Sequence, residues 1–247
     1  MIRLLRYSLF LVVLSACNRH FHVSEVKPAH YEVKSSKNDS IALLSALPYK
    51  QKLDSEMKQV IAYSDSNLTK DGNDVSLGNF ACGTVDDYVR VNKNELAGKH
   101  IVILNRGGLR NNLPAGEITK GHIFELMPFD NEVVILKISG EKIIEMINSM
   151  IKDKKLISRN LSFTSKDKEA LDIKIWGSPF NIKHEYYVVT TDYLAMGGDN
   201  CSFFAQPISY ETTKLKLRDV MINYCLTLTK INKHIIPERN SDVRISK

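Results

Sequence analysis

The spacing of apolar residues along the chain predicts both strands and helices. The run "HIVIL" over residues 100–104 is short and almost wholly apolar, the pattern of a buried strand, and "EYYVVTT" over residues 185–191 predicts another. Between them, residues 116–151 predict a strand, a short helix or turn, a second strand and a helix, in that order. The apolar face of that last helix consists of Ile143, Ile147, Met150 and Ile151.

Three further segments carry the signs of helices. After Pro48, which we expect to end any preceding helix, apolar residues at helical spacing are Leu53, Met57, Val60 and Ile61. Residues 76–90, "SLGNFACGTVDDYVR", predict a helix in which Gly78 and Gly83 lower the intrinsic stability and indicate close packing. Near the end of the chain, helical spacing is kept by Leu217, Met221, Tyr224 and Leu228.

These elements alternate without the strict strand–helix–strand rhythm of a parallel sheet. No stretch between residues 30 and 245 has the composition of an interdomain linker, and the chain contains no internal repeat. With 247 residues and 43% hydrophobic content, it can bury a sizeable core. The sequence therefore predicts one α+β domain over residues 30–247, with a mixed β-sheet and packed helices.

The first residues have the features of a bacterial lipoprotein signal. In "MIRLLRYSLFLVVLSAC", Arg3 and Arg6 precede an apolar run that is too short to span a bilayer, and small residues lead to Cys17. The "LSAC" sequence resembles a lipobox, whose cysteine is diacylated and becomes the first residue after cleavage. Residues 1–16 are therefore predicted to be a signal peptide, and an ordinary cleaved signal with a chance cysteine is the alternative.

Residues 17–29 are then predicted to be a lipidated cysteine followed by a polar tether. Asn18 stands where aspartate would give the commonest inner-membrane retention signal, so we expect a lipid-anchored protein of the bacterial cell envelope, at the outer membrane. His20 and His22 lie in this tether without a third metal ligand directly beside them, which favours a solvated linker over a metal site.

Charge indicates the class of ligand, and the cysteines bear on metal binding and disulfides. The 34 lysine and arginine residues exceed the 28 acidic ones, but they are spread thinly, so we expect a small anionic ligand and no nucleic acid. Cys82, Cys201 and Cys225 are widely spaced and form no metal-binding knuckle. We expect at least one buried thiol among them, and a single disulfide is an open alternative in an exported protein.

Three polar segments, "LNRGGLR", "MPFDN" and "DYLAMGGDN", lie at the ends of apolar strands, where functional loops tend to lie, and the first and the third contain a glycine pair. Arg106 and Arg110 can bind a phosphate or carboxylate through paired donors, and Gly107 with Gly108 lets backbone amides approach an anion. Turns and solvated arginines are the alternative explanation of the same residues.

The other two segments supply rings and a carboxylate. Phe129 and Tyr193 are suited to stacking a planar base from two sides. Asp199 can accept hydrogen bonds from vicinal hydroxyls such as those of ribose. Taken together, the three segments predict a nucleotide pocket, although each motif alone is also compatible with a turn or the edge of a core.

The order of motifs along the chain resembles the C-terminal domain of the 5'-nucleotidase family, from about residue 30 to residue 245. The motifs are "SLGNF", "NRGGLR", "GEIT", "LMPFDN", "ISGEKI", "YYVVTTDYLAMGGD" and "LRDVMINYCLTL". The resemblance implies that this domain holds a nucleoside between two aromatic rings. In the family, an N-terminal metallophosphoesterase domain with two metal ions then hydrolyses the phosphate ester.

The resemblance also implies individual roles. Phe129 and Tyr193 match the stacking pair, with tyrosine in place of a phenylalanine common in the family. Asn105 and Arg110 match residues that reach the nucleoside and phosphate side, and Asp199 matches the aspartate that holds the ribose hydroxyls. The turn glycines of the family, which offer possible backbone contacts, are matched by Gly107, Gly108, Gly197 and Gly198.

The chain departs from the family pattern in two respects. A phosphate-binding arginine often precedes the "LGN" helix, but "TKDGNDVSLGN" has only Lys70, which lacks the bidentate fork of arginine. The motifs that ligate two metals in the metallophosphoesterase half are absent. We therefore expect no catalytic residues, no metal site and no cofactor in this chain, and divalent metals in a partner.

Three functional hypotheses follow. The first is that the chain is the nucleotide-binding half of a split 5'-nucleotidase, working with a separately encoded metallophosphoesterase. The second is a stand-alone lipoprotein that binds nucleosides or nucleotides without an enzyme partner. The third is a vestigial pocket in a domain that serves only as an interaction module.

Overall fold

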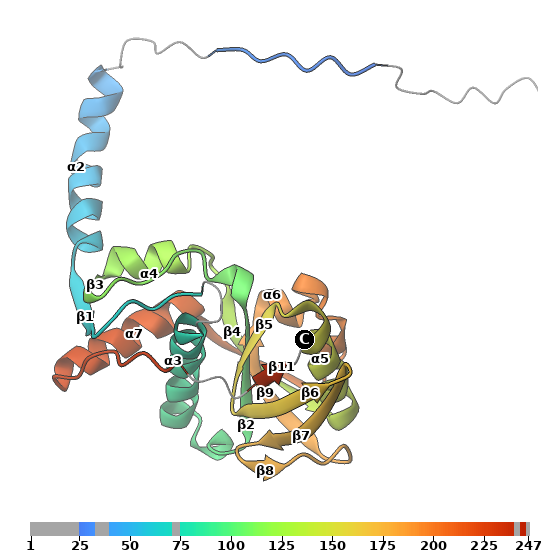
Figure 1. The fold of residues 1–247 in the computed structure, drawn as a ribbon. Helices are drawn as coiled ribbons and strands as arrows, with labels where there is room; N and C mark the ends of the chain where they lie inside the picture. Colours follow the sequence, from blue (N-terminus) through green and yellow to red (C-terminus); the bar gives the residue numbers. More distant parts are fainter. Residues whose placement is uncertain (1–24, 33–39, 71–74, 240–242, 246–247) are drawn as a thin grey trace, which may run out of the picture. The chain divides into compact units, whose positions relative to one another are not determined.

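The computed structural model describes residues 25–32, 40–70, 75–239 and 243–245. The predicted signal peptide and the predicted lipidation site at Cys17 lie outside these residues, as do Asn18, His20 and His22. Contacts between residues group the chain into two units, Met1–Ser45 and Ala46–Lys247. The second unit contains the sheets and all the described helices from α3 (Ser76–Asn92) onward. It matches the predicted α+β class (Figure 1), whereas the predicted domain start at residue 30 stays a prediction.

The helix α2 (Ser40–Met57) corrects two expectations about its segment. It continues through Pro48 although we expected this residue to end any helix, because a proline can remove one backbone hydrogen bond without stopping the turns on either side. Val60 and Ile61 do not continue the helical repeat, but begin strand β1 (Val60–Ser64), which suits their β-branched side chains. Among the described helices, including α2, none is both long and apolar enough to cross a bilayer.

The central sheet has the strand order β10-β4-β9-β2-β5. Strands β2 and β9 run parallel to each other, while β4 is antiparallel to both β9 and β10, so the sheet is mixed as predicted. The strands are β2 (His100–Asn105), β4 (Glu132–Ser139), β5 (Leu156–Arg159), β9 (Glu185–Thr191) and β10 (Ser209–Lys216).

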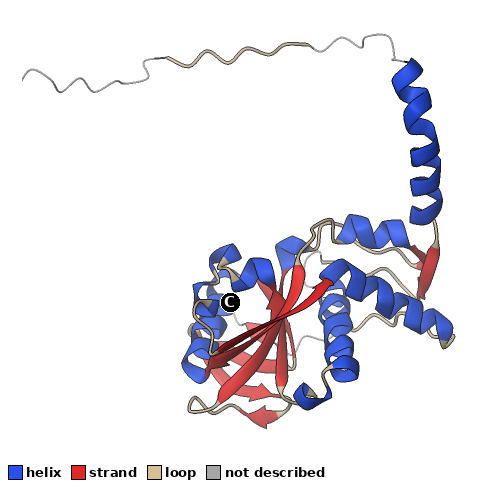
Figure 2. Cartoon of the chain, turned by 180° about the vertical axis from the view of Figure 1, so that it is seen from behind, coloured by secondary structure: helices blue, strands red, loops and turns tan. Residues whose placement is uncertain are grey.

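Both faces of this sheet are covered, as Figure 2 shows with helices on either side of the red strands. Along β2, Val102 and Leu104 pack into one core with α3, α4 and α7, while Ile101 and Ile103 pack into another with α5 and a second sheet. A strand buried on both faces is apolar at every position, which explains the continuous run in the sequence. The helices are α3 (Ser76–Asn92), α4 (Lys120–Leu126), α5 (Gly140–Asp153) and α7 (Leu217–Lys230).

Two smaller sheets complete the unit. Strand β1 pairs with β3 (Gly116–Thr119), and the second sheet has the order β11-β6-β7-β8. Its strands are β6 (Leu161–Lys166), β7 (Glu169–Ile175), β8 (Ser178–Pro179) and β11 (Val243–Ile245). The predictions for β2, α3, α7, β9 and the succession β3, α4, β4 and α5 are confirmed, whereas the apolar spacing predicted none of β5 to β8, β10 and β11.

The two glycines of α3 pack closely against β5, as their presence in a helix indicated. A Cβ at Gly78 would lie 3.3 Å from Ile157, and one at Gly83 would lie 3.7 Å from an Arg159 nitrogen. The three cysteines of this unit, Cys82, Cys201 and Cys225, are free and buried, so the expected buried thiol is confirmed and no disulfide joins them. Burial raises the pKa of each thiol to about 12.

The glycine of the "ISGEKI" motif is required by a close backbone approach. A Cβ at Gly140, the first residue of α5, would lie 2.2 Å from the carbonyl oxygen of Ile182. We expect Gly140→Ala to lower the free energy of unfolding by about 1–3 kcal/mol, because the backbone of Ile182 must move. Urea unfolding followed by circular dichroism measures this, with Asn148→Ala on the exposed side of α5 as the control. Equal stability of the two variants would contradict the steric explanation.

Candidate functional site

Three segments far apart in the sequence meet at one edge of the central sheet. Because β2 and β9 are parallel and β4 runs opposite to β9, the residues after β2, the residues after β9 and those before β4 lie at the same edge. These are the segments that contain "NRGGLR", "DYLAMGGDN" and "MPFDN". The strand order therefore converts three separate motifs into one site (Figure 1).

A pocket of about 270 Å³ opens between these segments. All five predicted substrate-binding residues contribute to its lining, which consists of Asn105, Gly107, Gly108, Arg110, Phe129, Asn131, Tyr193 and Asp199. Two other predicted glycines, Gly197 and Gly198, are outside this lining and form the turn that leads to Asp199. Sequence reasoning missed Asn131, whose only signal was its place in the "LMPFDN" motif.

The end of β2 provides a buried amide. Asn105 is only 8% exposed, and its Nδ2 donates a hydrogen bond to Asp199 Oδ2 at 2.7 Å. Behind it, a Cβ at Gly108 would lie 2.6 Å from Asn105 Oδ1, so glycine leaves the space that the amide occupies. The "NRGG" sequence thus positions one amide side chain rather than only forming a turn.

The segment after β9 combines a ring with a carboxylate. Tyr193, at the second position of α6 (Asp192–Ala195), donates its hydroxyl hydrogen to Asp199 Oδ1 at 3.2 Å. Asp199 has a left-handed backbone conformation with φ of 52°, and it follows Gly197 with φ of 93°. A Cβ at Gly198 would lie 2.5 Å from Cζ of the Tyr193 ring. The glycine pair therefore lets the ring and the carboxylate lie together.

Phe129 and Arg110 also line the pocket and lie next to each other. The Arg110 guanidinium carbon lies 5.6 Å from the centroid of the Phe129 ring, and Nη1 donates to the carbonyl oxygen of Gly107 at 3.2 Å. The rings of Phe129 and Tyr193 are 41% and 42% exposed, respectively, although aromatic rings of this size usually pack into a core. Both rings thus present apolar surface to the pocket.

Asp192 connects the start of β4 with the turn that carries Tyr193. Its Oδ1 accepts hydrogen bonds from the backbone N–H of Glu132 at 3.0 Å and from that of Tyr193 at 2.8 Å. One carboxylate oxygen therefore links the start of β4, just after Asn131, with the turn that carries Tyr193. This link limits how far the two ring-bearing segments can separate.

The positive charges before and after β2 differ in what they contact. Arg106 is not among the lining residues, and its Nη1 donates to the carbonyl oxygen of Lys70 at 3.1 Å, so the expected pairing of Arg106 with Arg110 around one anion is not formed. Lys70 Nζ in turn donates to the carbonyl oxygen of Leu109. Arg110 is the guanidinium that lines the pocket, while Arg106 and Lys70 hold the "NRGG" loop in place.

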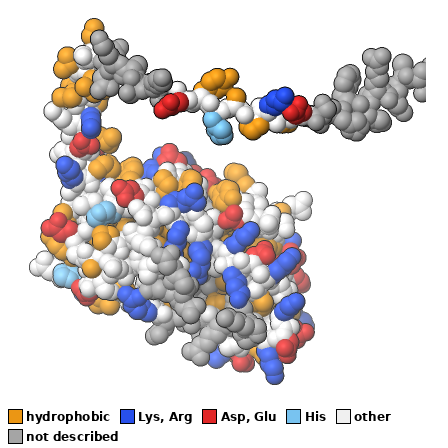
Figure 3. Space-filling model, turned by 45° about the horizontal axis from the view of Figure 1, so that its top comes forward, with side chains coloured by type: hydrophobic (Ala, Val, Ile, Leu, Met, Phe, Trp, Pro, Cys, Tyr) orange, Lys and Arg blue, Asp and Glu red, His pale blue; other side chains and the backbone are white. Residues whose placement is uncertain are grey.

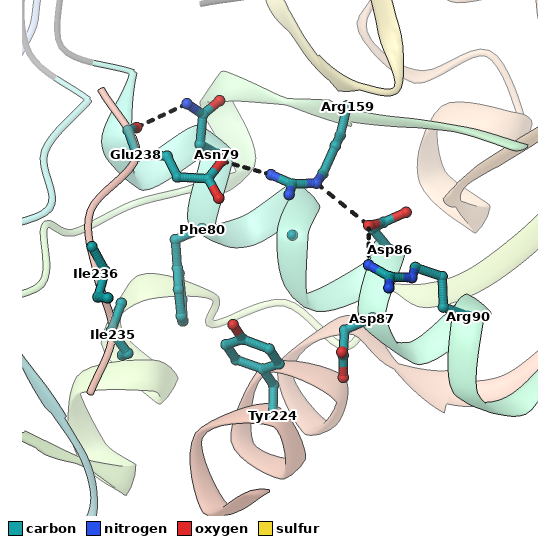
Figure 4. A pocket seen from close by; sticks show the side chains of 11 residues that line it. Asn79, Phe80, Asp86, Asp87, Arg90, Arg159, Tyr224, Ile235, Ile236 and Glu238 are labelled. Atoms are coloured by element: carbon teal, nitrogen blue, oxygen red, sulfur yellow. Dashed lines mark hydrogen bonds and ion pairs between the residues drawn. The ribbon is translucent and has the colours of Figure 1, made fainter. Parts of the chain in front are cut away.

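A second pocket lies between α3, α7 and the segment around Glu238 (Figure 4). Four of its charged groups bind one another: Arg159 contacts Glu238 at 2.9 Å and Asp86 at 3.5 Å, and Arg90 contacts Asp86 at 3.9 Å. The Asn79 amide donates to the Glu238 carbonyl oxygen at 2.8 Å. Because these groups already satisfy each other, we assign no ligand to this pocket.

Asp86 is the centre of this charged cluster and is only 3% exposed. Its Oδ1 contacts His100 Nε2 at 3.0 Å and accepts a hydrogen bond from Asn160 at 2.8 Å, while the other His100 ring nitrogen lies 3.0 Å from the Leu96 carbonyl oxygen. Burial alone would raise the pKa of Asp86, but the bonds to His100 and Asn160 outweigh it and hold the pKa below its ordinary value of 3.8.

Within the described residues, no three His, Cys, Asp or Glu side chains are grouped so as to hold a metal ion. Basic and acidic side chains are interspersed on the face shown in Figure 3. The pocket beside Arg110 is therefore the site in the described part of the chain whose residue types converge on one ligand chemistry.

Comparison with known proteins agrees with this geometry. The family model for the 5'-nucleotidase C-terminal domain matches residues 56–206, more than half of the chain. UshA of Escherichia coli strain K12 is 26% identical over 164 residues, which cover 64% of this chain and 29% of UshA. The trifunctional nucleotide phosphoesterase protein YfkN of Bacillus subtilis strain 168 is 27% identical over 183 residues, which cover 64% of this chain and 12% of YfkN.

Among solved structures, the 5'-nucleotidase precursor from Thermus thermophilus has the same fold. It superposes with a TM-score of 0.66 at 23% identity, covering 84% of this chain and 43% of that protein. The part that matches this chain is less than a third of the length of UshA and of YfkN. The family match, the shared fold and the motif residues gathered at one sheet edge show that the chain belongs to the 5'-nucleotidase C-terminal domain family.

Proposed function

We propose that the chain binds nucleosides and nucleotides in the pocket between Phe129 and Tyr193. The observation that supports this most is the convergence of all five motif residues with Asn131 on one cavity. Two partly exposed rings can stack on the two faces of a base, an interaction that tolerates any base because every base has a π-face. The Asn131 amide can then bind the edge of the base through its donor and acceptor.

Asp199 is the proposed partner of the ribose. Hydrogen bonds from Asn105 and Tyr193 fix the orientation of its carboxylate and use one acceptor position on each oxygen. A carboxylate has about four lone-pair positions, so acceptor capacity remains for two vicinal hydroxyls. The left-handed backbone at Asp199 is a local strain of the kind found where function requires a fixed geometry.

The phosphate of a nucleotide is proposed to lie beside Arg110. This guanidinium is exposed at the pocket and can form paired hydrogen bonds with phosphate oxygens. Lys70 is engaged with the Leu109 carbonyl oxygen and gives no second cation at the pocket. We therefore expect the nucleoside to provide most of the affinity, with AMP binding only slightly more tightly than adenosine.

The larger proposal is that this binding serves hydrolysis of phosphate esters by a separate chain. The relatives named 5'-nucleotidase and nucleotide phosphoesterase extend well beyond the part that matches this chain. We propose that a metallophosphoesterase, carrying the divalent metals, acts on the nucleotide that this chain presents. Mixing the chain with a metallophosphoesterase encoded beside it is expected to raise AMP hydrolysis. Binding without any such gain would leave a stand-alone nucleotide-binding lipoprotein.

The predicted lipid anchor at Cys17 would place this activity in the bacterial cell envelope, at the outer membrane. A diacylated cysteine binds membranes through its acyl chains, so the wild-type protein is expected in the membrane fraction. Movement of the Cys17→Ser protein to the soluble fraction is the result that this proposal requires, and equal distribution of the two proteins would contradict it.

Replacing the proposed ribose ligand gives a selective prediction. Asp199→Asn is expected to weaken adenosine binding by about 1–3 kcal/mol while leaving 2'-deoxyadenosine binding much less affected, because the deoxy compound lacks one of the hydroxyls that the carboxylate accepts. Calorimetric titration with both ligands measures the difference, with the exposed Asp153→Asn as a matched control. Equal losses for the two ligands would remove the ribose assignment.

A further inference from the structure

Outside the pocket lining, one arginine contacts the segment that carries Phe129. Arg218, the second residue of α7, is only 8% exposed, which is unusual because arginine is rarely buried unless it is paired. Its Nη1 donates to the carbonyl oxygens of Met127 at 3.3 Å and Phe129 at 3.5 Å. Its Nη2 donates to Asp130 Oδ1 at 2.6 Å. A single guanidinium thus holds three acceptors of one short segment.

The guanidinium is itself fixed by a ring. The Arg218 Cζ lies 4.3 Å from the centroid of Phe124, on α4, the helix that precedes the segment. A planar guanidinium stacked on an aromatic face keeps its donors in a fixed fork, which a lysine ammonium cannot reproduce. Arg218 therefore connects α7, α4 and the segment between α4 and β4.

Residues next to Arg218 contact the same segment. Lys216 Nζ lies 2.9 Å from Asp130 Oδ2, and the backbone N–H of Leu217 donates to the carbonyl oxygen of Asn131 at 2.9 Å. Hydrogen bonds from Lys216 and then Arg218 hold the pKa of Asp130 below its ordinary value. The start of α7 thus contacts Asp130, Asn131 and the carbonyl oxygen of Phe129 itself.

We propose that Arg218 is a positioning residue that holds the Phe129 ring at the pocket. The ring is 41% exposed, so packing of its side chain contributes only part of what orders it, and its backbone carbonyl oxygen accepts a hydrogen bond from Arg218. Arg218 does not line the pocket, so its effect on binding passes through the segment that it holds, in which it contacts the carbonyl oxygen of Phe129 itself. The link to affinity rests on the proposed nucleoside binding, whereas the link to the order of Phe129 does not.

A tryptophan in place of Phe129 reports on the order of this segment without any ligand. The full-length chain has one tryptophan, so Trp176→Phe with Phe129→Trp leaves a single reporter at the pocket. In this background, Arg218→Met is expected to raise the acrylamide quenching constant of the reporter at least about twofold, because three contacts to the segment are lost. Arg218→Lys is expected to be intermediate, and Arg90→Met on α3 is the control without effect.

Circular dichroism of each variant shows whether the fold is kept. If Arg218→Met does not fold, Asp130→Asn decides instead, because this exposed side chain then loses its ion pairs with Lys216 and Arg218, and the reporter quenching should still rise. An unchanged quenching constant in the folded Arg218→Met protein, or in Asp130→Asn if Arg218→Met fails to fold, would overturn the proposal.

The effect of Arg218 on affinity is tested separately, by measuring adenosine binding. In the natural sequence, Arg218→Met is expected to weaken adenosine binding about fivefold or more, and to have no further effect once Phe129→Ala is present, since coupled residues are non-additive. A full additional loss in the Phe129→Ala protein would contradict positioning through the ring. If wild-type protein binds no adenosine, the proposed function fails, and the quenching result still decides whether Arg218 orders the segment.

Discussion

Replacing Asp86 with alanine is expected to lower the free energy of unfolding by about 3–5 kcal/mol. The carboxylate is 3% exposed and accepts from Asn160, while His100 and Arg159 lie within 3.0 and 3.5 Å of its oxygens. Its removal leaves the buried His100 ring on β2 without its charged partner, and it takes one partner each from Asn160 and from Arg159, which keeps its contact with Glu238. Such groups can regain hydrogen bonds only by unfolding or by admitting water.

Chemical unfolding of wild type and variant measures this loss. Asp87→Ala is the matched control, because Asp87 is the next residue on α3 and is partly exposed, and the same change in helix propensity applies. We expect the control to change stability by less than about 1 kcal/mol. A similar loss for both variants would mean that the buried cluster contributes little.

The pH dependence of the stability difference between wild type and Asp86→Ala has a defined sign. The folded-state pKa of Asp86 lies below its ordinary value of 3.8, because the bonds to His100 and Asn160 outweigh the effect of burial. The carboxylate therefore contributes its full stabilisation above that value and loses it as pH falls through the folded-state pKa. The stability gap between wild type and Asp86→Ala should narrow below pH 3.8. A gap that widens on acidification would contradict the assignment.

Replacing Phe129 with alanine is expected to weaken adenosine binding by about 1–3 kcal/mol, which is about 5-fold to 150-fold in the dissociation constant. The ring provides one of the two proposed stacking surfaces and also the face beside the Arg110 guanidinium. Since the side chain is 41% exposed, stability should change little. The variant therefore separates binding from folding better than any change to the buried Asn105.

Titration calorimetry with adenosine measures the effect, and two variants serve as controls. Phe129→Tyr keeps a ring and should retain most of the affinity. Tyr210→Ala removes an exposed ring on β10 that does not line the pocket, and it should bind as wild type does. If Phe129→Ala binds as tightly as these controls, stacking by Phe129 is wrong.

The elements with strong apolar patterns were predictable from sequence. Strand β2 is buried on both faces and has no polar position between its first and last residues, so its pattern is unambiguous. Strand β10 is an edge strand without a single buried position, and the sequence "SYETTKLK" has no apolar face to mark it. Strand β7 is similar, with most of its residues exposed or partly exposed. Such strands form because they pair with neighbouring strands. The spacing of apolar residues along the chain does not show which strands pair.

The residues of the site could be predicted from the sequence, but the arrangement that brings them together could not. Motif resemblance indicated Phe129, Tyr193 and Asp199, yet their meeting depends on β9 lying between β4 and β2, a matter of strand order. From the sequence, Arg106 and Arg110 were equivalent candidates for binding an anion. The structure shows that Arg106 donates to the carbonyl oxygen of Lys70, whereas Arg110 lines the pocket.

The hydrogen bonds that Asp192 and Arg218 make beside the site could not be predicted from the sequence either, because they also depend on the tertiary structure. The bonds from Asp192 to the start of β4 and from Arg218 to the Phe129 segment join residues 60 and 88 to 91 positions apart. Both residues lie inside motifs of the family resemblance, but nothing in those motifs indicates which groups their side chains contact. Their roles follow from tertiary contacts alone.

The central claim is that the pocket between Phe129 and Tyr193 binds nucleosides and nucleotides. Titration of the purified wild-type protein with adenosine and with AMP in a calorimeter tests it most directly. We expect saturable binding of both ligands at one site per chain, with mutual competition. Absence of saturable binding of either ligand up to millimolar concentration would contradict it.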